Sequence, residues 1–181
     1  MTMQSYIRRQ MLDERKALTP IYINHFQFLF DERLNSFISQ FSSVAMYSAI
    51  RNEVSVNCVV ECLVSDYIAL PKIDSNDELI FVNYENPSLW QVGPYDILEP
   101  TTSIIDFLPE AFIVPLTAID HLGTRVGMGK GYYDRYLQSI QNRVTLIGVG
   151  WDFQLVDVNL PRQSHDVPMH YFISPSHFIK F

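Results

Sequence analysis

The sequence predicts an α/β protein with a single domain over residues 1–181, in which helices cover both faces of a largely parallel sheet to give three layers. Three observations favour this class. Helical and strand-like segments alternate along the chain, the strand-like segments are short and almost wholly apolar, and no repeat or linker divides them. With 48% hydrophobic and 18% charged residues, the 181-residue chain can bury a substantial core and is not disordered throughout.

The first predicted helix covers residues 6–18. Helical spacing places Ile7 with Met11 on one side and Arg8 with Arg15 on another. We therefore expect a short amphipathic helix with a basic side.

The second predicted helix begins where Thr19 precedes Pro20, because threonine is a favourable N-cap and proline suits the first helical position. Apolar residues then recur at steps of three and four, which predicts one broad core-facing stripe. The stripe consists of Ile23, Phe26, Phe30, Leu34, Phe37 and Phe41.

The remaining elements are predicted from short apolar runs. Residues 44–49, a helix over 54–65 that carries both cysteines, and residues 67–71 form the order strand, helix, strand. Residues 86–100 have the proline and glycine content of a loop, and 132–140 are predicted to be helical. The other predicted strands are 79–84, 112–115, 145–150 and 171–174.

Charge and cysteine content exclude several classes of protein. Thirteen basic against twenty acidic residues give a net charge of −7, which disfavours nucleic acid as a partner. No segment is long and apolar enough to span a membrane, and the N-terminus lacks the apolar run of a signal peptide. Cys58 and Cys62, spaced as on one helix face, are expected to be packed thiols rather than zinc ligands or a disulfide. We therefore expect a cytoplasmic protein.

The most unusual passage is GTRVGMGKGYYDRYL, residues 123–137. Gly127, Gly129 and Gly131 alternate just before a predicted helix, and Arg125 and Lys130 lie among them. Glycines let the backbone approach a ligand closely, and a helix N-terminus adds partial positive charge. The pattern therefore predicts a phosphate-binding loop.

Neither common phosphate motif matches the passage. A P-loop would need glycine in place of Thr124 and serine or threonine in place of Gly131, and the dinucleotide fingerprint has another glycine spacing. A purely structural turn is the alternative. Asp134 favours the phosphate hypothesis, because a carboxylate beside a phosphate site can hold Mg²⁺, although an acidic residue in a first helical turn also stabilises the helix dipole.

The passage resembles the signature G-x-R-x-G-x-G-x-G-Y-Y-D of the 5-formyltetrahydrofolate cyclo-ligase family, the methenyltetrahydrofolate synthetases. Other segments resemble the family's motifs in the same order: a basic N-terminal helix, an acidic position at Glu53, LPK, DILEP and SHDVPM. The resemblance covers nearly the whole chain. It implies a three-layer α/β/α fold of the NagB/RpiA/CoA-transferase-like type.

The resemblance also implies a ligase reaction, the ATP- and Mg²⁺-dependent conversion of 5-formyltetrahydrofolate to 5,10-methenyltetrahydrofolate with release of ADP and phosphate. The formyl oxygen attacks the γ-phosphate, and N10 of the folate then closes the ring as phosphate leaves. Positioning and charge stabilisation matter most in such phosphoryl transfer. The implied partners are these small molecules, without nucleic acid or membrane, and we expect a monomer.

Site residues follow from the resemblance position by position. Arg125 and Lys130 are the implied catalytic residues, and Asp134 and Asp166 the implied Mg²⁺ ligands. The implied ATP-binding residues are Gln4, Arg8, Arg125, Gly127, Gly129, Lys130, Gly131 and Tyr132. The implied folate-binding residues are Glu53, Tyr95, Met128 and Tyr133.

The chain departs from the family pattern at three positions. Gln4 replaces a frequent lysine, Met128 a frequent arginine or aromatic residue, and Leu116 a usual glycine. An active cyclo-ligase is the main hypothesis. The departures keep open a non-catalytic relative that binds folate or nucleotide, and fold alone also allows another phosphotransfer or sugar-phosphate enzyme.

Overall fold

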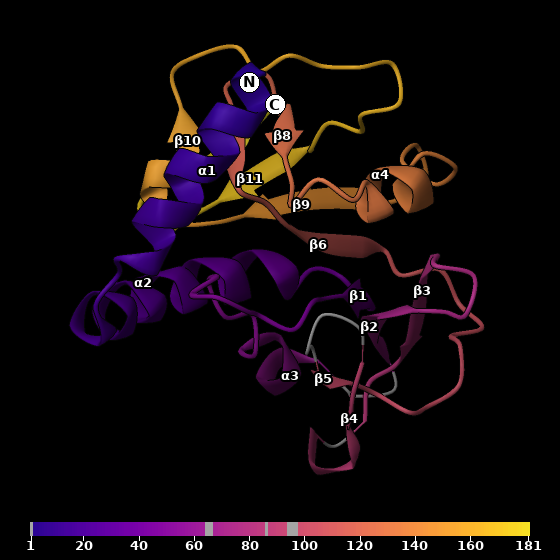
Figure 1. Ribbon diagram of the computed structural model, residues 1–181. Helices are drawn as coiled ribbons and strands as arrows, with labels where there is room; N and C mark the ends of the chain where they lie inside the picture. Colours follow the sequence, from indigo (N-terminus) through magenta and orange to yellow (C-terminus); the bar gives the residue numbers. More distant parts are fainter. Residues whose placement is uncertain (1, 64–66, 86, 94–97) are drawn as a thin grey trace.

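A seven-stranded sheet forms the centre of the structure, a computed structural model that describes residues 2–63, 67–85, 87–93 and 98–181 (Figure 1). The strand order is β12-β11-β9-β6-β1-β2-β3. The five inner strands run parallel, whereas β3 and β12 pair antiparallel at the two edges. The strands are β1 (Val44–Ala45), β2 (Ile68–Ile73), β3 (Leu79–Asn83), β6 (Ala111–Pro115), β9 (Thr145–Val149), β11 (Tyr171–Ile173) and β12 (Phe178–Lys180).

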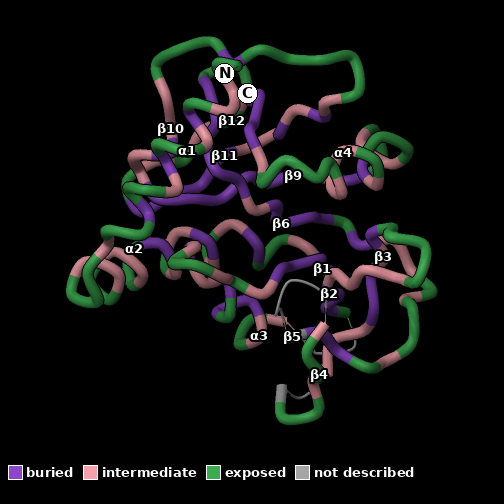
Figure 2. Tube along the Cα trace, in the orientation of Figure 1, coloured by how far each residue is buried: buried purple, intermediate pink, exposed green. Residues whose placement is uncertain are grey.

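Helices cover both faces of this sheet, so the predicted three-layer α/β class is confirmed. On one face α2 (Pro20–Ile38) packs the predicted stripe against β1, β6 and β9, with Phe30 and Leu34 fully buried and the other stripe residues half-buried. The last stripe residue, Phe41, lies beyond the end of the helix. On the other face α4 (Tyr132–Leu137) inserts Leu137 among strand residues such as Phe112. Figure 1 shows the two helices on opposite sides of the central strands, and Figure 2 shows those strands as the most buried part of the chain.

The helix starts follow the sequence closely. Thr19 caps α2 by accepting a hydrogen bond from the Tyr22 amide, as predicted. Thr2 caps α1 (Met3–Lys16) in the same way through the Ser5 amide, so this helix begins earlier than expected. No helix in the described part of the chain is long and apolar enough to cross a membrane.

The prediction of a basic side on α1 was wrong for Arg15. Its side chain is only 1% exposed and shares the buried face of the helix with Ile7 and Met11. The three residues are spaced by four, so they line up along one side of the helix. This face packs on a small sheet of order β10-β7-β8, formed by Leu155–Val156, Ala118–Asp120 and Arg125–Val126.

Several boundaries differ from the prediction. Strand β1 has two residues rather than six, and α3 covers only Val59–Cys62 of the predicted 54–65. Both thiols are free; the expected packing is confirmed for Cys58, which is buried just before α3, but was wrong for Cys62, which is exposed. The helix predicted over 132–140 ends at Leu137. The hairpin β7–β8, the pair β4–β5 (Gln91–Val92 and Leu98–Glu99) and strand β12 are additional elements.

The connection after β6 is fixed by one buried amide. Gln154 is 1% exposed; its Nε2 donates to the carbonyl oxygens of Leu116 (2.8 Å) and Thr117 (2.9 Å), and its Oε1 accepts from the Trp151 amide at 2.9 Å. Leu116, at the position where the family has glycine, is buried beside Gly148. A β-carbon on Gly148 would lie 2.9 Å from the Leu116 side chain, so the leucine fits because the glycine has none.

We expect Gln154→Ala to lower the free energy of unfolding by about 2–4 kcal/mol, because two carbonyls and one amide would be left buried without partners. Chemical denaturation of this variant and of Gln138→Ala, a change at the exposed C-cap position of α4, measures the effect. The control should stay within about 0.5 kcal/mol of wild type. Equal stability of the two variants would contradict the role given to Gln154.

Candidate active site

A pocket of about 510 Å³ lies at the carboxyl ends of the parallel strands. One wall is the turn that follows β1 and carries Glu53, and another is the loop between β8 and α4, residues 127–131. These two segments lie far apart in sequence but follow neighbouring strands, because β1 pairs with β6 and the hairpin β7–β8 continues from β6. The Glu53 turn and the glycine-rich loop therefore meet at one pocket.

The glycine-rich loop has the backbone conformation that its sequence predicts. Gly129 and Gly131 have φ angles of 99° and 69°, in the left-handed region where other residues are strained. Arg8 of α1 crosses to this loop: its Nε donates to the Gly127 carbonyl at 2.7 Å, and its guanidinium lies against Gly129. A cation from the first helix is thus held at the loop.

Lys130 is exposed at the edge of the loop and lines the pocket. Beside it, the Tyr132 hydroxyl donates to the Asp77 carboxylate at 2.6 Å, which links the start of α4 to the β2–β3 turn. Lys130 and Arg8 are thus two cations beside the glycine-rich loop, and Lys130 is open to solvent.

Arg125, which is buried, and Asp134, which is half-buried, form an ion pair in the pocket wall. The Arg125 Nη2 donates to Asp134 Oδ1 at 2.8 Å, and its Nη1 donates to the Val167 carbonyl. The Val167 amide donates to the same Asp134 oxygen at 3.1 Å. These contacts tie the glycine-rich segment to the segment that carries Asp166. The sequence did not indicate this pairing of Arg125 with Asp134.

Asp134 and Asp166 both line the pocket. Each carboxylate accepts from a backbone amide through only one of its two oxygens. Asp166 Oδ2 accepts from the Gln163 amide at 2.7 Å, and its Oδ1 lies 3.7 Å from His165 Nε2. Within the described residues no group of three or more His, Cys, Asp or Glu side chains could hold a metal ion alone. Two carboxylates nevertheless suit Mg²⁺, which keeps several waters and uses substrate phosphates as ligands.

The other end of the pocket is acidic and buried. Glu53 Oε2 accepts a hydrogen bond from the Ile50 amide at 3.1 Å, and Oε1 lies 3.3 Å from Nη1 of Arg15. Burial raises the pKa of the Glu53 carboxyl above its usual range, while the nearby Arg15 guanidinium opposes that shift. The pocket therefore joins a shielded carboxyl group to an exposed cationic loop.

Tyr133 contributes a buried hydroxyl that has no hydrogen-bond partner in the described structure. Burial raises its pKa well above the usual range, so it stays a neutral donor.

Met128 is 41% exposed at the rim, where the Thr117 hydroxyl contacts its sulfur at 3.7 Å. The expected contact of Tyr95 falls outside the described residues.

The pocket brings together all the predicted site residues that lie within the described part of the chain. Gln4 is held by a 2.7 Å hydrogen bond from its Nε2 to the Pro161 carbonyl. Sequence reasoning missed Arg15 as a partner of Glu53, and Lys72 and Glu99 as pocket residues. The four-residue spacing of Arg15 from Met11 and the motifs that contain Lys72 and Glu99 were the available signals.

The fold and the pocket define an α/β protein with a pocket at the carboxyl edge of a mostly parallel sheet. Residues 1–175 match the 5-formyltetrahydrofolate cyclo-ligase family, and the chain belongs to that family. The 5-formyltetrahydrofolate cyclo-ligase of Mycoplasma pneumoniae is 31% identical over 157 residues, which are 83% of this chain and 87% of the relative. That of Escherichia coli K12 is 34% identical over 143 residues, 74% of this chain and 78% of the relative.

Solved structures agree with this assignment. The solution structure of 5,10-methenyltetrahydrofolate synthetase from Aquifex aeolicus superimposes with a TM-score of 0.82 at 27% identity, covering 99% of this chain and 93% of the other. The 5,10-methenyltetrahydrofolate synthetase of Mycoplasma pneumoniae gives a TM-score of 0.77 at 25% identity, covering 97% and 100%. The fold and family are thus those of these ligases.

We expect Asp134→Ala to destabilise the protein even without ligand or metal, by about 2–4 kcal/mol, because it leaves the buried Arg125 guanidinium without its carboxylate. The matched control is Asp13→Ala, which breaks an exposed Arg–Asp contact of 4.0 Å on α1 and should cost less than about 0.5 kcal/mol. Thermal and chemical denaturation in the presence of a metal chelator measure both. An Asp134→Ala protein as stable as wild type would show that the carboxylate has no such structural role.

Proposed function

We propose that this chain, as one unit, is an active 5-formyltetrahydrofolate cyclo-ligase that uses ATP and Mg²⁺ to form 5,10-methenyltetrahydrofolate. The observation that carries the proposal is the pocket with two unlike ends in a chain of this family. A buried carboxylate at one end suits the amino and ring N–H groups of a pterin. A glycine-rich loop with two cations at the other end suits a triphosphate.

The residues divide between the two substrates accordingly. Glu53 accepts hydrogen bonds from the pterin, and Tyr133 offers its ring and hydroxyl to the folate, with Met128 and Tyr95 nearby in the proposed complex. Arg8, Lys130 and the backbone of residues 127–131 hold the triphosphate. The Arg8 contact with the Gly127 carbonyl and the exposure of Lys130 support this division.

Lys130 and Arg125 have different parts in the reaction. Lys130 neutralises charge that develops as the γ-phosphoryl group passes to the formyl oxygen of the folate. Arg125, fixed by Asp134 and Val167, keeps the loop in place and adds positive charge behind it. Gln4 supplies hydrogen-bonding groups but no charge, so Arg8 is the cation from α1 at the triphosphate.

Asp134 and Asp166 would hold Mg²⁺, directly or through water, and the ion would neutralise the phosphate oxygens when bound. Both carboxylates line the pocket with the glycine-rich loop, which supports this assignment. We further propose a monomer that works in the cytoplasm. The two free thiols, Cys58 and Cys62, are consistent with a reducing compartment.

The direct test incubates purified protein with 5-formyltetrahydrofolate and Mg²⁺, with and without ATP, and follows the near-ultraviolet absorbance of the methenyl product together with ADP release. ATP-dependent product matched by ADP is the expected result. Binding of both ligands by titration calorimetry without any product would instead support the non-catalytic relative.

We expect Lys130→Ala to lower kcat/KM about 10²- to 10³-fold, as when one charge-stabilising donor is removed from a transition state. The free energy of unfolding should change by less than about 0.5 kcal/mol, since the side chain is exposed. Lys180→Ala, at an exposed position on the edge strand β12, is the control and should retain wild-type kinetics. Wild-type kcat/KM in Lys130→Ala would remove this residue from the mechanism.

We expect Tyr133→Phe to raise the KM for 5-formyltetrahydrofolate about 2- to 10-fold, because the folate loses a hydrogen bond to the buried hydroxyl. Stability should be unchanged or slightly higher, since that hydroxyl has no partner in the protein. Tyr136→Phe, a half-buried tyrosine of the same helix that does not line the pocket, should leave the KM unchanged. If Tyr133→Phe instead lost stability and kept its KM, the hydroxyl would be a structural group.

A further inference from the structure

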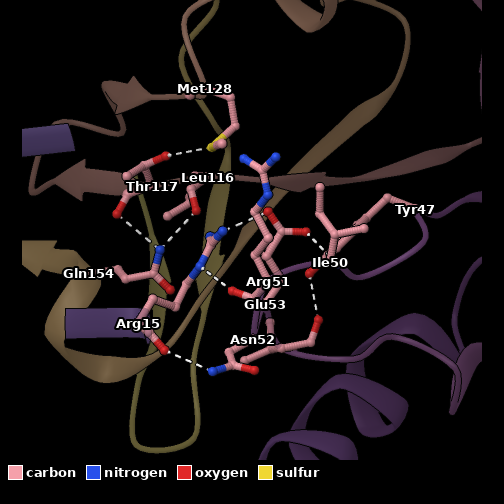
Figure 3. Close-up of polar contacts among 12 residues, drawn as sticks. Arg15, Tyr47, Ile50, Arg51, Asn52, Glu53, Leu116, Thr117, Met128 and Gln154 are labelled. Carbon is pink, nitrogen blue, oxygen red and sulfur yellow. Dashed lines mark hydrogen bonds and ion pairs between the residues drawn. The ribbon is translucent and has the colours of Figure 1, made fainter. Parts of the chain in front are cut away.

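Arg15 lies behind Glu53 and does not itself line the pocket. The two side chains are 1% and 8% exposed, and Nη1 of the arginine is 3.3 Å from Oε1 of the carboxylate. Figure 3 shows the guanidinium between the Glu53 turn and the connection after β6. Because α1 otherwise buries only Ile7 and Met11, an arginine at this position needs a reason other than packing.

Arg15 also fixes the backbone of the turn that carries Glu53. Its Nε donates to the Arg51 carbonyl at 3.0 Å, and its own carbonyl accepts from the Asn52 side-chain amide at 3.1 Å (Figure 3). The Trp151 indole donates to the Asn52 carbonyl at 2.7 Å. Arg51 and Asn52 have φ angles of 49° and 58°, a left-handed conformation that non-glycine residues adopt at a cost. These hydrogen bonds hold the turn in that conformation.

The Glu53 carboxylate keeps free capacity for a ligand. A carboxylate offers about four lone-pair positions. One oxygen accepts from the Ile50 amide, and the other faces Arg15 Nη1 without an aligned hydrogen bond. The carboxylate is therefore oriented from behind while its remaining positions are open to the pocket.

We propose that Arg15 is a positioning residue that holds Glu53 as an oriented, deprotonated acceptor for the N–H-donating edge of the substrate's heterocycle. This inference rests on the proposed function, because it assumes that Glu53 binds the folate. Arg15 acts only through Glu53 and touches neither substrate.

The groups that face Glu53 determine how its charge responds to pH. They are Arg15 from α1, Arg51 from its own turn, Tyr47 from the end of β1 and Tyr133 from α4. Burial keeps both tyrosines neutral by raising their pKa values, so the arginines are the only cations among these four groups. Burial raises the pKa of Glu53 and Arg15 lowers it, so removing Arg15 raises this pKa further. Protonated Glu53 offers fewer acceptor positions. As the pH falls, a variant without Arg15 therefore loses folate binding at a higher pH than wild type does.

The test compares Arg15→Met and Arg15→Lys, with Arg9→Met as a control at an exposed arginine of the same helix. We expect Arg15→Met to raise the KM for 5-formyltetrahydrofolate about 10- to 100-fold, as for the loss of a hydrogen-bonding partner of a buried charge. The KM for ATP should change by less than about 3-fold, within the range of indirect effects. The acid limb of kcat/KM should move to higher pH in profiles from about pH 5 to pH 9, and Arg15→Lys should return it toward wild type.

A double-variant cycle distinguishes the loss of Glu53 positioning from misfolding caused by an unpaired buried charge. In the Glu53→Gln background, Arg15→Met should add less than about a 2-fold change to the folate KM, because its target is already neutral. Thermal denaturation and ATP titration show whether each variant is folded.

Three results would overturn the inference: an unshifted pH profile in Arg15→Met, equal losses for folate and ATP, or the same effect of Arg15→Met with and without Glu53. Measuring folate binding and turnover by the wild-type protein separates this inference from the proposed function. Wild-type protein that neither binds folate nor turns it over would refute both. Active wild type with an insensitive Arg15→Met would refute only the role of Arg15.

Discussion

The parallel pairing of β1 with β6 is the constraint on which the site depends. Val44 lies opposite Ala111 and Ala45 opposite Phe112, so both strands end at the same edge of the sheet. The chain leaves β1 into the Glu53 turn and leaves β6 into the hairpin that precedes the glycine-rich loop. Shared strand direction therefore brings an acidic turn and a basic loop to one pocket, although about seventy residues separate them in sequence.

Contacts from outside the sheet hold these two segments in place. Helix α1 reaches both of them, through Arg8 at Gly127 and through Arg15 at Glu53. Gln154 fixes the connection after β6, and the Arg125–Asp134 pair joins the loop to the segment before β11. The first helix thus extends along the pocket from the glycine-rich loop to the buried Glu53 carboxylate. This explains why a helix with exposed basic residues also carries a buried arginine.

Local signals predicted the parts of the structure that depend on local physics. The Thr19-Pro20 start of α2, its apolar stripe and the glycines at 129 and 131 follow from capping, periodicity and backbone freedom. Tertiary contacts decided the rest. The hairpin β7–β8, whose second strand lies in the glycine-rich passage, was not predicted. The burial of Arg15 and its pairing with Glu53 depend on segments distant in sequence. The Arg125–Asp134 contact likewise was not visible in the sequence, which suggested ligand roles for both residues and a helix-dipole effect for Asp134.

The most direct measurement is a crystal structure of the protein with 5-formyltetrahydrofolate and a non-hydrolysable ATP analogue in the presence of Mg²⁺. We expect the pterin within hydrogen-bonding distance of the Glu53 carboxylate and the triphosphate against residues 127–131, with the formyl oxygen facing the γ-phosphate. A complex with the pterin at the glycine-rich loop, or with the triphosphate at Glu53, would contradict the division of the pocket into acidic and basic ends.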